Sequence, residues 1–231
     1  MVLGNGMIAT ALKAVNRKDV LYAASGLSNL KGADPAERQR ERQLIEKQIA
    51  LHADKIFVYI SSYSIDDQNP EKNTPYLEHK LHMEKLVAQM APRYLIIRTS
   101  NVVGNSRQPG NLMNFIFDNL IKATPFEVWT GTSRNLIDVD DLAKMAASAI
   151  EMGFIGQVLY LIHPVDIPIY NIVRHFEDLS GRKANCSLVD KGVHYRADKT
   201  LSIQLFEKLH LEPNPDLYAR GLIHKYFGQK F

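Results

Sequence analysis

Short apolar runs alternate with longer amphipathic segments along this chain. The apolar runs are rich in β-branched and aromatic residues, so they predict strands at 2–3, 20–24, 56–60, 94–98, 126–129 and 158–162. The amphipathic segments predict helices at 9–15, 36–53, 76–90, 112–123, 139–152 and 170–179. On the second of these helices we expect an inner side formed by Leu44, Ile45, Ile49 and Leu51. Strands that alternate with helices predict an α/β fold, a parallel sheet with helices on both faces.

Glycines, a serine and an asparagine interrupt this pattern where the predicted strands end. Gly4, Gly26, Ser62 and Asn101 each lie at or just beyond the end of an apolar run. Ligands of open parallel sheets bind at the carboxyl ends of the strands. We therefore expect the functional residues at this edge of the sheet.

The first strand leads into a glycine turn and then a helix. Gly4, Gly6 and Ala9 have the spacing GxGxxA, which lets the backbone approach a pyrophosphate at the positive end of a helix. Taken alone, the motif also fits a glycine-rich turn without a ligand. An acidic residue about 20 positions further on commonly holds the ribose of such a dinucleotide. None is evident here, because Asp19 precedes the second strand rather than following it.

A stronger signal is a tyrosine and a lysine spaced as YxxxK on a predicted helix. Tyr76 and Lys80 share one helix face, and an adjacent ammonium favours the phenolate form of a phenol. Such a tyrosine can exchange a proton with a substrate hydroxyl or carbonyl. Ser62, at the end of the preceding strand, can hydrogen-bond the same oxygen. The alternative is an exposed tyrosine and a solvated lysine, but a strand, a serine, a loop and then YxxxK is a less accidental order.

Composition and charge fit a compact soluble protein. The chain has 231 residues, 45% of them hydrophobic and 23% charged, and a formal charge of +3, which is too small to indicate nucleic-acid binding. The single cysteine, Cys186, fits a reducing compartment. No run approaches the roughly 18 apolar residues of a membrane span. We therefore expect a cytoplasmic protein that binds no nucleic acid and has no membrane span.

Two histidines on the YxxxK helix suggest metal ligation at first sight. His79 and His82 are three positions apart, but no set of cysteines or carboxylates completes a site. We expect both to be histidines of the helix surface, and we expect no metal.

Six segments, in the correct order, resemble the extended short-chain dehydrogenase/reductase family, especially its nucleotide-sugar epimerases, dehydratases and reductases. They are GNGMIA at 4–9, FVYISS at 57–62, YLEHK at 76–80, RTSNVVG at 98–104, GNLM at 110–113 and RNLIDVDDLA at 134–143. The likeness covers nearly the whole chain. It implies a Rossmann-like domain, 1–108 and 126–162, and a small C-terminal substrate-binding lobe, 109–125 and 163–231.

The resemblance implies a role for each matching residue. Tyr76 would be the catalytic acid/base, Lys80 its ammonium partner and a ribose contact, and Ser62 the donor that polarises the carbonyl. NAD or NADP would bind at Gly4, Gly6, Ala9, Ala24 and Lys80. Asn101 and Asn111 would touch the sugar nucleotide and Arg134 its diphosphate. The alternatives are a strand-end or helix-cap role for each asparagine and a surface ion pair for Arg134, for example with Asp138.

The chain departs from the family in its N-terminal half. Between the glycine turn and Val20 there is room for one helix only, whereas the family has two further strands and a helix there. The missing section ordinarily carries the residue that selects the adenosine ribose. The choice between NAD and NADP therefore stays open.

The resemblance implies an NAD(P)-dependent oxidoreductase or epimerase that acts on a nucleotide-diphosphate sugar in surface-polysaccharide biosynthesis. Because the adenosine section is short, a non-catalytic nucleotide-binding or scaffold subunit is the alternative. Family members commonly form homodimers, here through helices 36–53 and 76–90, and the sequence leaves this partner open.

Overall fold

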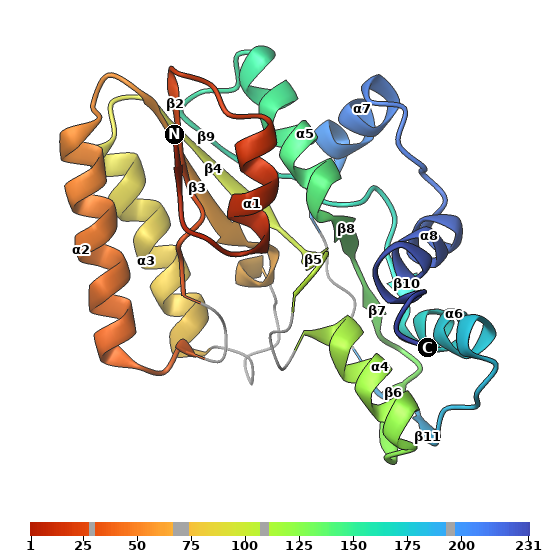
Figure 1. Ribbon diagram of the computed structural model, residues 1–231. Helices are drawn as coiled ribbons and strands as arrows, with labels where there is room; N and C mark the ends of the chain where they lie inside the picture. Colours follow the sequence, from red (N-terminus) through yellow and green to blue (C-terminus); the bar gives the residue numbers. More distant parts are fainter. Residues whose placement is uncertain (28–30, 67–73, 107–110, 193–196) are drawn as a thin grey trace.

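The centre of the molecule is a five-stranded parallel sheet (Figure 1). The computed structural model describes residues 1–27, 31–66, 74–106, 111–192 and 197–231. The strand order is β1-β2-β3-β4-β9, and every neighbouring pair is parallel. The strands are β1 (Val2–Leu3), β2 (Val20–Ala23), β3 (Ile56–Ser62), β4 (Tyr94–Thr99) and β9 (Gln157–Tyr160). The predicted α/β fold with a parallel sheet is confirmed.

Two pairs of helices cover the two faces of the sheet (Figure 1). On one face lie α1 (Met7–Ala14) and α5 (Val139–Glu151), and on the other lie α2 (Pro35–Leu51) and α3 (Pro75–Met90). Asp34 and Thr74 cap α2 and α3 by accepting backbone N–H groups, and a proline follows each cap. A proline at the first helical position costs no hydrogen bond, because the first N–H groups of a helix have no partner within the helix. The capping residue and the proline therefore define where α2 and α3 begin.

The inner side of α2 differs from the prediction at its last residue. Ile45 and Ile49 are buried, but the side chain of Leu51 is 61% exposed. Leu51 follows Ile49 by two positions, which turns it to the opposite side of a helix with 3.6 residues per turn. The inward position one turn before Ile45 is taken by Glu41, whose exposure is 0%.

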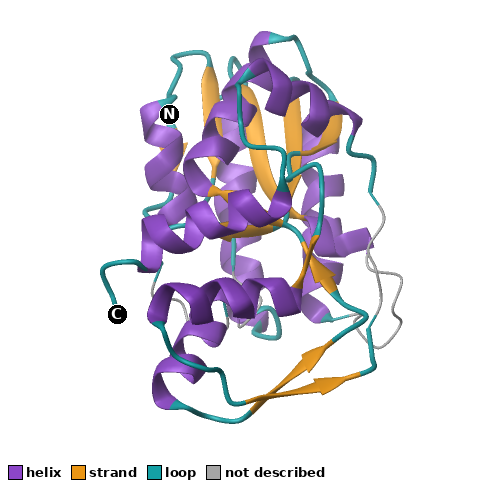
Figure 2. Ribbon diagram, turned by 90° about the vertical axis from the view of Figure 1, so that its right-hand side faces the viewer, coloured by secondary structure: helices purple, strands orange, loops and turns teal. Residues whose placement is uncertain are grey.

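Several short elements surround the carboxyl end of the sheet. The 3-10 turn η2 (Tyr63–Asp66) follows β3. Strand β5 (Asn101–Val103) pairs with β8 (Leu136–Asp138), β7 (Ser133–Arg134) with β10 (Ile167–Pro168), and β6 (Phe126–Trp129) with β11 (Cys186–Val189). Figure 2 shows the β6 and β11 pair at the lower end of the molecule.

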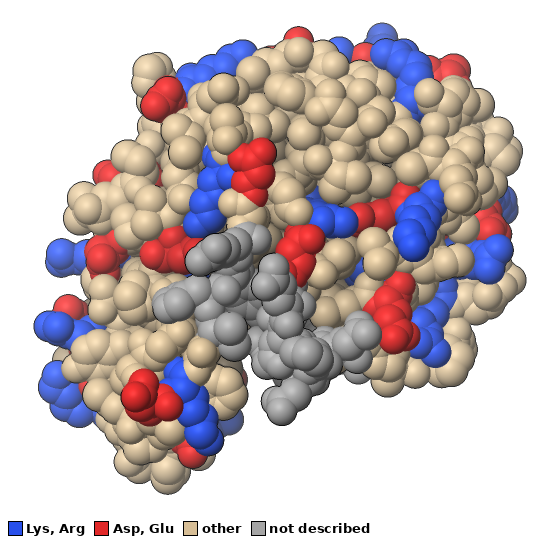
Figure 3. Space-filling model, turned by 180° about the vertical axis from the view of Figure 1, so that it is seen from behind, with Lys and Arg blue, Asp and Glu red and all other residues tan. Residues whose placement is uncertain are grey.

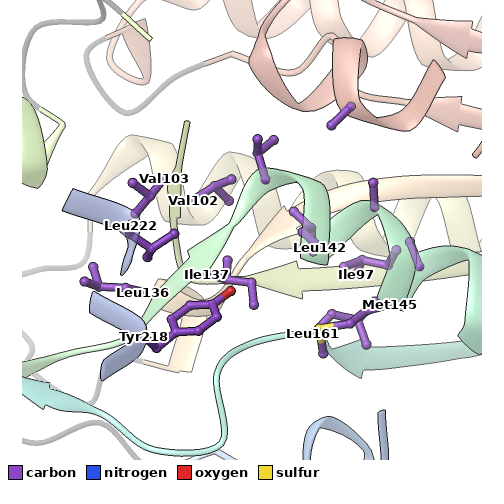
Figure 4. Packing of buried hydrophobic residues seen from close by; sticks show 14 of the residues in the cluster. Ile97, Val102, Val103, Leu136, Ile137, Leu142, Met145, Leu161, Tyr218 and Leu222 are labelled. Atoms are coloured by element: carbon purple, nitrogen blue, oxygen red, sulfur yellow. The ribbon is translucent and has the colours of Figure 1, made fainter. Parts of the chain in front are cut away.

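The remaining helices pack beside these strands. They are α4 (Leu112–Lys122), α6 (Ile169–Ser180), α7 (Thr200–Lys208) and α8 (Pro215–Phe227). One apolar cluster extends from the sheet face under α5 to α8. It contains Ile97 of β4, Met145 of α5, Ile137 of β8, and Tyr218 and Leu222 of α8 (Figure 4). The division into two domains stays a prediction, since this core passes between them.

The surface carries charges of both signs. Figure 3 shows acidic and basic side chains interspersed on one face, with wide uncharged areas between them. No helix in the described ranges is long and apolar enough to cross a membrane.

Candidate active site

A cavity of about 270 Å³ opens at the carboxyl ends of β2, β3 and β4. Five of the residues predicted for the site line it: Ser62, Tyr76, Lys80, Ala24 and Asn111. Met7 and Ile8, the first two residues of α1, line it as well. The cavity therefore lies between the YxxxK helix and the glycine turn.

Ser62 and Tyr76 approach the cavity from consecutive elements. Ser62 is the last residue of β3, and its hydroxyl oxygen accepts the N–H of Ser64 at 3.2 Å. That bond starts the turn η2. Tyr76 is the second residue of α3 and is half-buried. One strand end and one helix start thus direct a hydroxyl and a phenol at the same space.

Lys80 is buried at the rim of the cavity and belongs to what we call the Glu41 cluster: Glu41, Tyr59, His79 and Lys80. Its ammonium donates to the Tyr59 hydroxyl at 2.9 Å and to Glu41 Oε1 at 3.2 Å. Tyr59 donates to the same carboxylate oxygen at 2.7 Å. The second oxygen, Oε2, lies 3.1 Å from His79 Nε2 and accepts the N–H of Leu27 at 2.9 Å.

The surroundings of Glu41 keep it ionised. Burial by itself would raise the pKa of this carboxyl, but the hydrogen bond with His79 and the charge of Lys80 outweigh burial and hold the pKa well below its usual range. Burial and the neighbouring Glu41 carboxylate raise the pKa of Tyr59 well above its usual value. Tyr59 therefore acts as a neutral hydroxyl that links a carboxylate to an ammonium.

The expectation that His79 lies on the helix surface is wrong. Its side chain is 7% exposed and hydrogen-bonded to Glu41, whereas His82 is exposed. The reason is the neighbouring α2, which packs against α3 and supplies a buried carboxylate partner. Among the residues that the structure describes, no group of three potential metal ligands comes together.

A second network of buried charges, the Glu84 cluster, lies next to the first: Ser61, Asp66, Glu84 and Arg98. Arg98 donates to both oxygens of Glu84, at 3.0 and 2.7 Å, and to Asp66 at 2.9 Å. Burial would lower the pKa of Arg98, but Glu84 and Asp66 together raise it. Because Asp66 ends η2, this arginine fixes the segment that follows Ser62.

The glycine turn has the backbone geometry that its motif requires. Gly4 has a φ of +106°, and a Cβ there would lie 2.5 Å from the carbonyl oxygen of Ala24. Only glycine fits this close approach. A Cβ on Gly6 would meet nothing within 4 Å, so the turn is open on the side where α1 begins. Ala9 is fully buried, where its small side chain packs between α1 and the sheet.

The residues predicted to touch the sugar nucleotide are spread over three elements. Asn111 lines the cavity and also caps α4, accepting the N–H of Met113 at 3.0 Å. Asn101 lies at the start of β5, where its amide donates to the Asn135 carbonyl at 2.9 Å. Arg134 lies on β7 and donates to the Ser133 carbonyl at 3.0 Å. Asn101 and Arg134 are not part of the described lining of the cavity.

The carboxylate of Asp138 is hydrogen-bonded by two residues of α8, the C-terminal helix. Lys225 donates to its carboxylate at 2.9 Å, and Tyr226 donates at 3.1 Å. Asp138 also caps α5 through the N–H of Asp140. This residue joins α5 to α8.

Sequence reasoning missed Glu41, Glu84 and Asp66. A signal for Glu41 exists in retrospect, since it falls in helical register with the buried Ile45 and Ile49. The register predicts that it faces the sheet but does not identify its partner. Glu84 lies one turn after Lys80 on the same helix, which places it on the buried face as well.

The parallel sheet with a cavity at its carboxyl edge defines a Rossmann-like fold, and a family comparison agrees. Residues 8–161 match the model of the NAD dependent epimerase/dehydratase family. This chain belongs to that family. No curated protein matches the sequence.

Solved structures of the same fold come from several bacteria. RMD from Pseudomonas aeruginosa, complexed with NADPH, is 17% identical, with a TM-score of 0.71 over 100% of this chain and 98% of that chain. UDP-glucuronic acid 4-epimerase from Bacillus cereus, in complex with UDP-glucuronic acid and NAD, is 18% identical, with a TM-score of 0.70 over 98% and 81%. dTDP-glucose 4,6-dehydratase from Bacillus anthracis, in complex with NAD, is 13% identical, with a TM-score of 0.64 over 90% and 73%. At these identities the likeness establishes the fold.

Proposed function

We propose that this protein is an NAD(P)-dependent oxidoreductase or epimerase that acts on a nucleotide-diphosphate sugar. One observation carries the proposal: Ser62, Tyr76 and Lys80 line a single cavity together with the first two residues of α1. A packed scaffold has no physical need for a serine, a phenol and an ammonium around one hollow. The solved neighbours that hold NADPH, NAD or UDP-glucuronic acid support the same class of ligands.

The residues of the glycine turn fit a dinucleotide. The backbone of Gly4 is held against Ala24, and the open space beside Gly6 admits a diphosphate at the N-terminus of α1. The positive end of the helix and its unpaired N–H groups favour such an anion. The bound nicotinamide would supply or accept a hydride. Residues 15–19, between α1 and β2, contain no strand to carry a ribose selector, so we propose NAD or NADP without choosing between them.

The proton chemistry would fall to this chain's own residues. Tyr76 would give a proton to, or take one from, an oxygen on the sugar, which the hydroxyl of Ser62 would hold in place. Lys80 would favour the phenolate of Tyr76 when that proton leaves and would contact the ribose of the cofactor. We propose Asn101, Asn111 and Arg134 as contacts of the sugar nucleotide, with the guanidinium of Arg134 on the diphosphate.

Reduction and epimerisation use the same residues. A keto reductase requires one hydride transfer, whereas an epimerase requires oxidation, rotation of the keto intermediate and reduction on its other face. We propose hydride transfer at C4 of the sugar and a role in surface-polysaccharide biosynthesis in the cytoplasm.

A homodimer through α2 and α3 is part of the proposal. Both helices carry exposed apolar residues, namely Leu51, Leu81 and Met90. Pairing of two copies would cover this surface. Sedimentation that finds only monomers at high protein concentration would count against it.

Replacement of Tyr76 by phenylalanine tests the activity. We expect Tyr76→Phe to abolish turnover, because the ring stays but the exchangeable proton is lost, while binding of the sugar nucleotide is nearly unchanged. The assay follows oxidation of NADH or NADPH by absorbance with a series of 4-keto nucleotide sugars. Tyr170→Phe is the matched control, since Tyr170 is exposed and lies outside the cavity lining. Full activity of Tyr76→Phe would refute the assignment.

A second candidate is a non-catalytic nucleotide-binding or scaffold subunit. One observation favours it, the short connection between α1 and β2 at residues 15–19. This candidate predicts that a nucleotide sugar binds but is never turned over with either cofactor.

A further inference from the structure

The most deeply buried charge near the cavity belongs to a residue that the proposed chemistry does not use. Glu41 has no exposed surface and accepts hydrogen bonds on both carboxylate oxygens. Taking a carboxylate out of water costs several kcal/mol unless it is paired and fully hydrogen-bonded. The sequence places an acid here among isoleucines that serve the core, so its position has a reason other than packing.

We propose that Glu41 is a positioning residue, which holds the ammonium of Lys80 at the rim of the cavity for its contact with the cofactor ribose. This inference deepens the proposed function and rests on it. Glu41 itself does not line the cavity. It would act on the cofactor through Lys80 and not by direct contact.

The geometry leaves Lys80 little freedom. Its ammonium is held by Tyr59 at 2.9 Å, by Glu41 at 3.2 Å and by the Ile60 carbonyl at 3.4 Å. Two of these three acceptors are neutral, so Glu41 is the one that compensates the positive charge. Burial disfavours an ammonium, and Lys80 is only 3% exposed. Glu41 is therefore the partner that pairs with this buried positive charge.

The same carboxylate also fixes the cavity wall on the side of β2. The N–H of Leu27 donates to Glu41, and both Gly26 and Leu27 line the cavity. A Cβ on Gly26 would lie 2.6 Å from the Lys80 ammonium nitrogen and 2.8 Å from Glu41 Oε1. The backbone after β2 therefore packs directly on the ion pair. Glu41 joins α2, β3, α3 and this segment at one point.

Other titratable groups also face the cluster. His79 contacts the second oxygen of Glu41 from α3, and Tyr59 contacts the first from β3. A Glu41 variant changes these two contacts together with the ion pair to Lys80.

The test measures the affinity for NADH and for NADPH in wild type, Glu41→Gln and Glu41→Asp. We expect Glu41→Gln to bind the preferred cofactor about tenfold more weakly than wild type, a typical cost of removing a supporting partner. We expect Glu41→Asp, which keeps the negative charge, to bind more tightly than Glu41→Gln. A purely structural role would give the opposite order, because glutamine keeps the shape of the side chain and aspartate does not. Glu46→Gln is the matched control, on the same helix and paired at the surface with Arg42, and it is expected to behave as wild type.

The outcomes separate the inference from the proposed function. If wild type binds neither cofactor, the proposed function fails and the inference fails with it. If wild type binds and Glu41→Gln matches Glu46→Gln in affinity, only the inference is overturned. If Glu41→Gln does not fold, Glu41→Asp decides: it keeps the charge but withdraws it by one methylene, and cofactor affinity equal to wild type would overturn the inference.

Discussion

The carboxyl edge of the sheet and the packing of α4, α6 and α8 are stabilised in different ways. At the sheet edge, two buried carboxylates, Glu41 and Glu84, meet Lys80 and Arg98 beneath the cavity. Between the three helices, aromatic rings fill the space instead. Phe176 and Phe227 lie 5.0 Å apart between ring centroids, and Phe117 lies 5.3 Å from Phe227.

The difference indicates where buried charged side chains occupy positions that apolar residues could fill. Aromatic packing gains free energy from burial alone, whereas a buried ion pair at best breaks even with an apolar core of the same volume. The charged clusters therefore add no stability beyond what an apolar core in the same place would give. Both clusters adjoin the cavity, since Lys80 of the first and Ser61 of the second line it.

Breaking the Glu84 cluster has the largest expected effect. Arg98→Met leaves Glu84 and Asp66 without their cation, and we expect the free energy of unfolding to fall by about 3–5 kcal/mol at neutral pH. Arg98→Lys, which keeps the positive charge, should lose less stability. Urea unfolding of both variants measures the difference, and equal losses in the two variants would contradict the account.

A cavity in the aromatic packing should cost a similar amount by another route. Phe176 is fully buried, and Phe176→Ala is expected to lower the free energy of unfolding by about 3–5 kcal/mol. Here Phe176→Leu should lose less stability than Phe176→Ala, because apolar volume and not charge stabilises this region. Urea unfolding measures both variants, and equal losses in the two would remove the contrast between the two regions.

Alanine substitutions at the two glycines of the first turn distinguish an effect on stability from an effect on ligand binding. Gly4→Ala forces a Cβ against Ala24 at a positive φ, which should cost about 1–3 kcal/mol of stability. Gly6→Ala meets open space and should cost only about 0.5–1 kcal/mol as a poorer helix cap. It should nevertheless weaken binding of NADH or NADPH, since its methyl group enters the space proposed for the diphosphate. Calorimetric titration of Gly6→Ala checks this, and unchanged affinity would show that the turn holds no dinucleotide.

Two buried groups make the stability of the fold depend on acid pH. The pKa of Glu41 is lower in the folded protein than the 4.5 of a free glutamate. Its contribution to the free energy of unfolding is therefore complete above pH 4.5 and is lost as the pH falls below that value. Burial lowers the pKa of His163 from 6.5, so its contribution to the free energy of unfolding is complete above pH 6.5 and is lost first on acidification. In thermal unfolding, the loss below pH 6.5 should disappear in His163→Gln, and the loss below pH 4.5 should disappear in Glu41→Gln. Identical pH profiles for both variants and wild type would refute the assignment.

The sequence predicted the sheet and its covering helices because both obey simple periodicities. The strands of the central sheet are apolar runs, and helices such as α3 begin at a capping residue and a proline. Strands β5, β7, β8 and β10 have only two or three residues, too few for a period to be visible. Helix α8 was missed although Asn214 caps it before Pro215.

The candidate site was predicted in part for a similar reason. Ser62, Tyr76 and Lys80 come from a strand and a helix that lie close together in the sequence, so their spacing predicts that they line the same site. Glu41 reaches Lys80 across 39 positions of sequence, and only the packing of α2 on α3 reveals the pair. Local spacing cannot predict such a contact.

The central claim, that this cavity holds a nicotinamide dinucleotide against Lys80, is tested most directly by calorimetry. Purified protein is titrated with NADH and with NADPH separately, and the titrations are repeated with Lys80→Ala. The account predicts saturable binding of at least one cofactor and weaker binding in the variant. No heat of binding to well-folded wild-type protein, or equal affinity in wild type and Lys80→Ala, would contradict it.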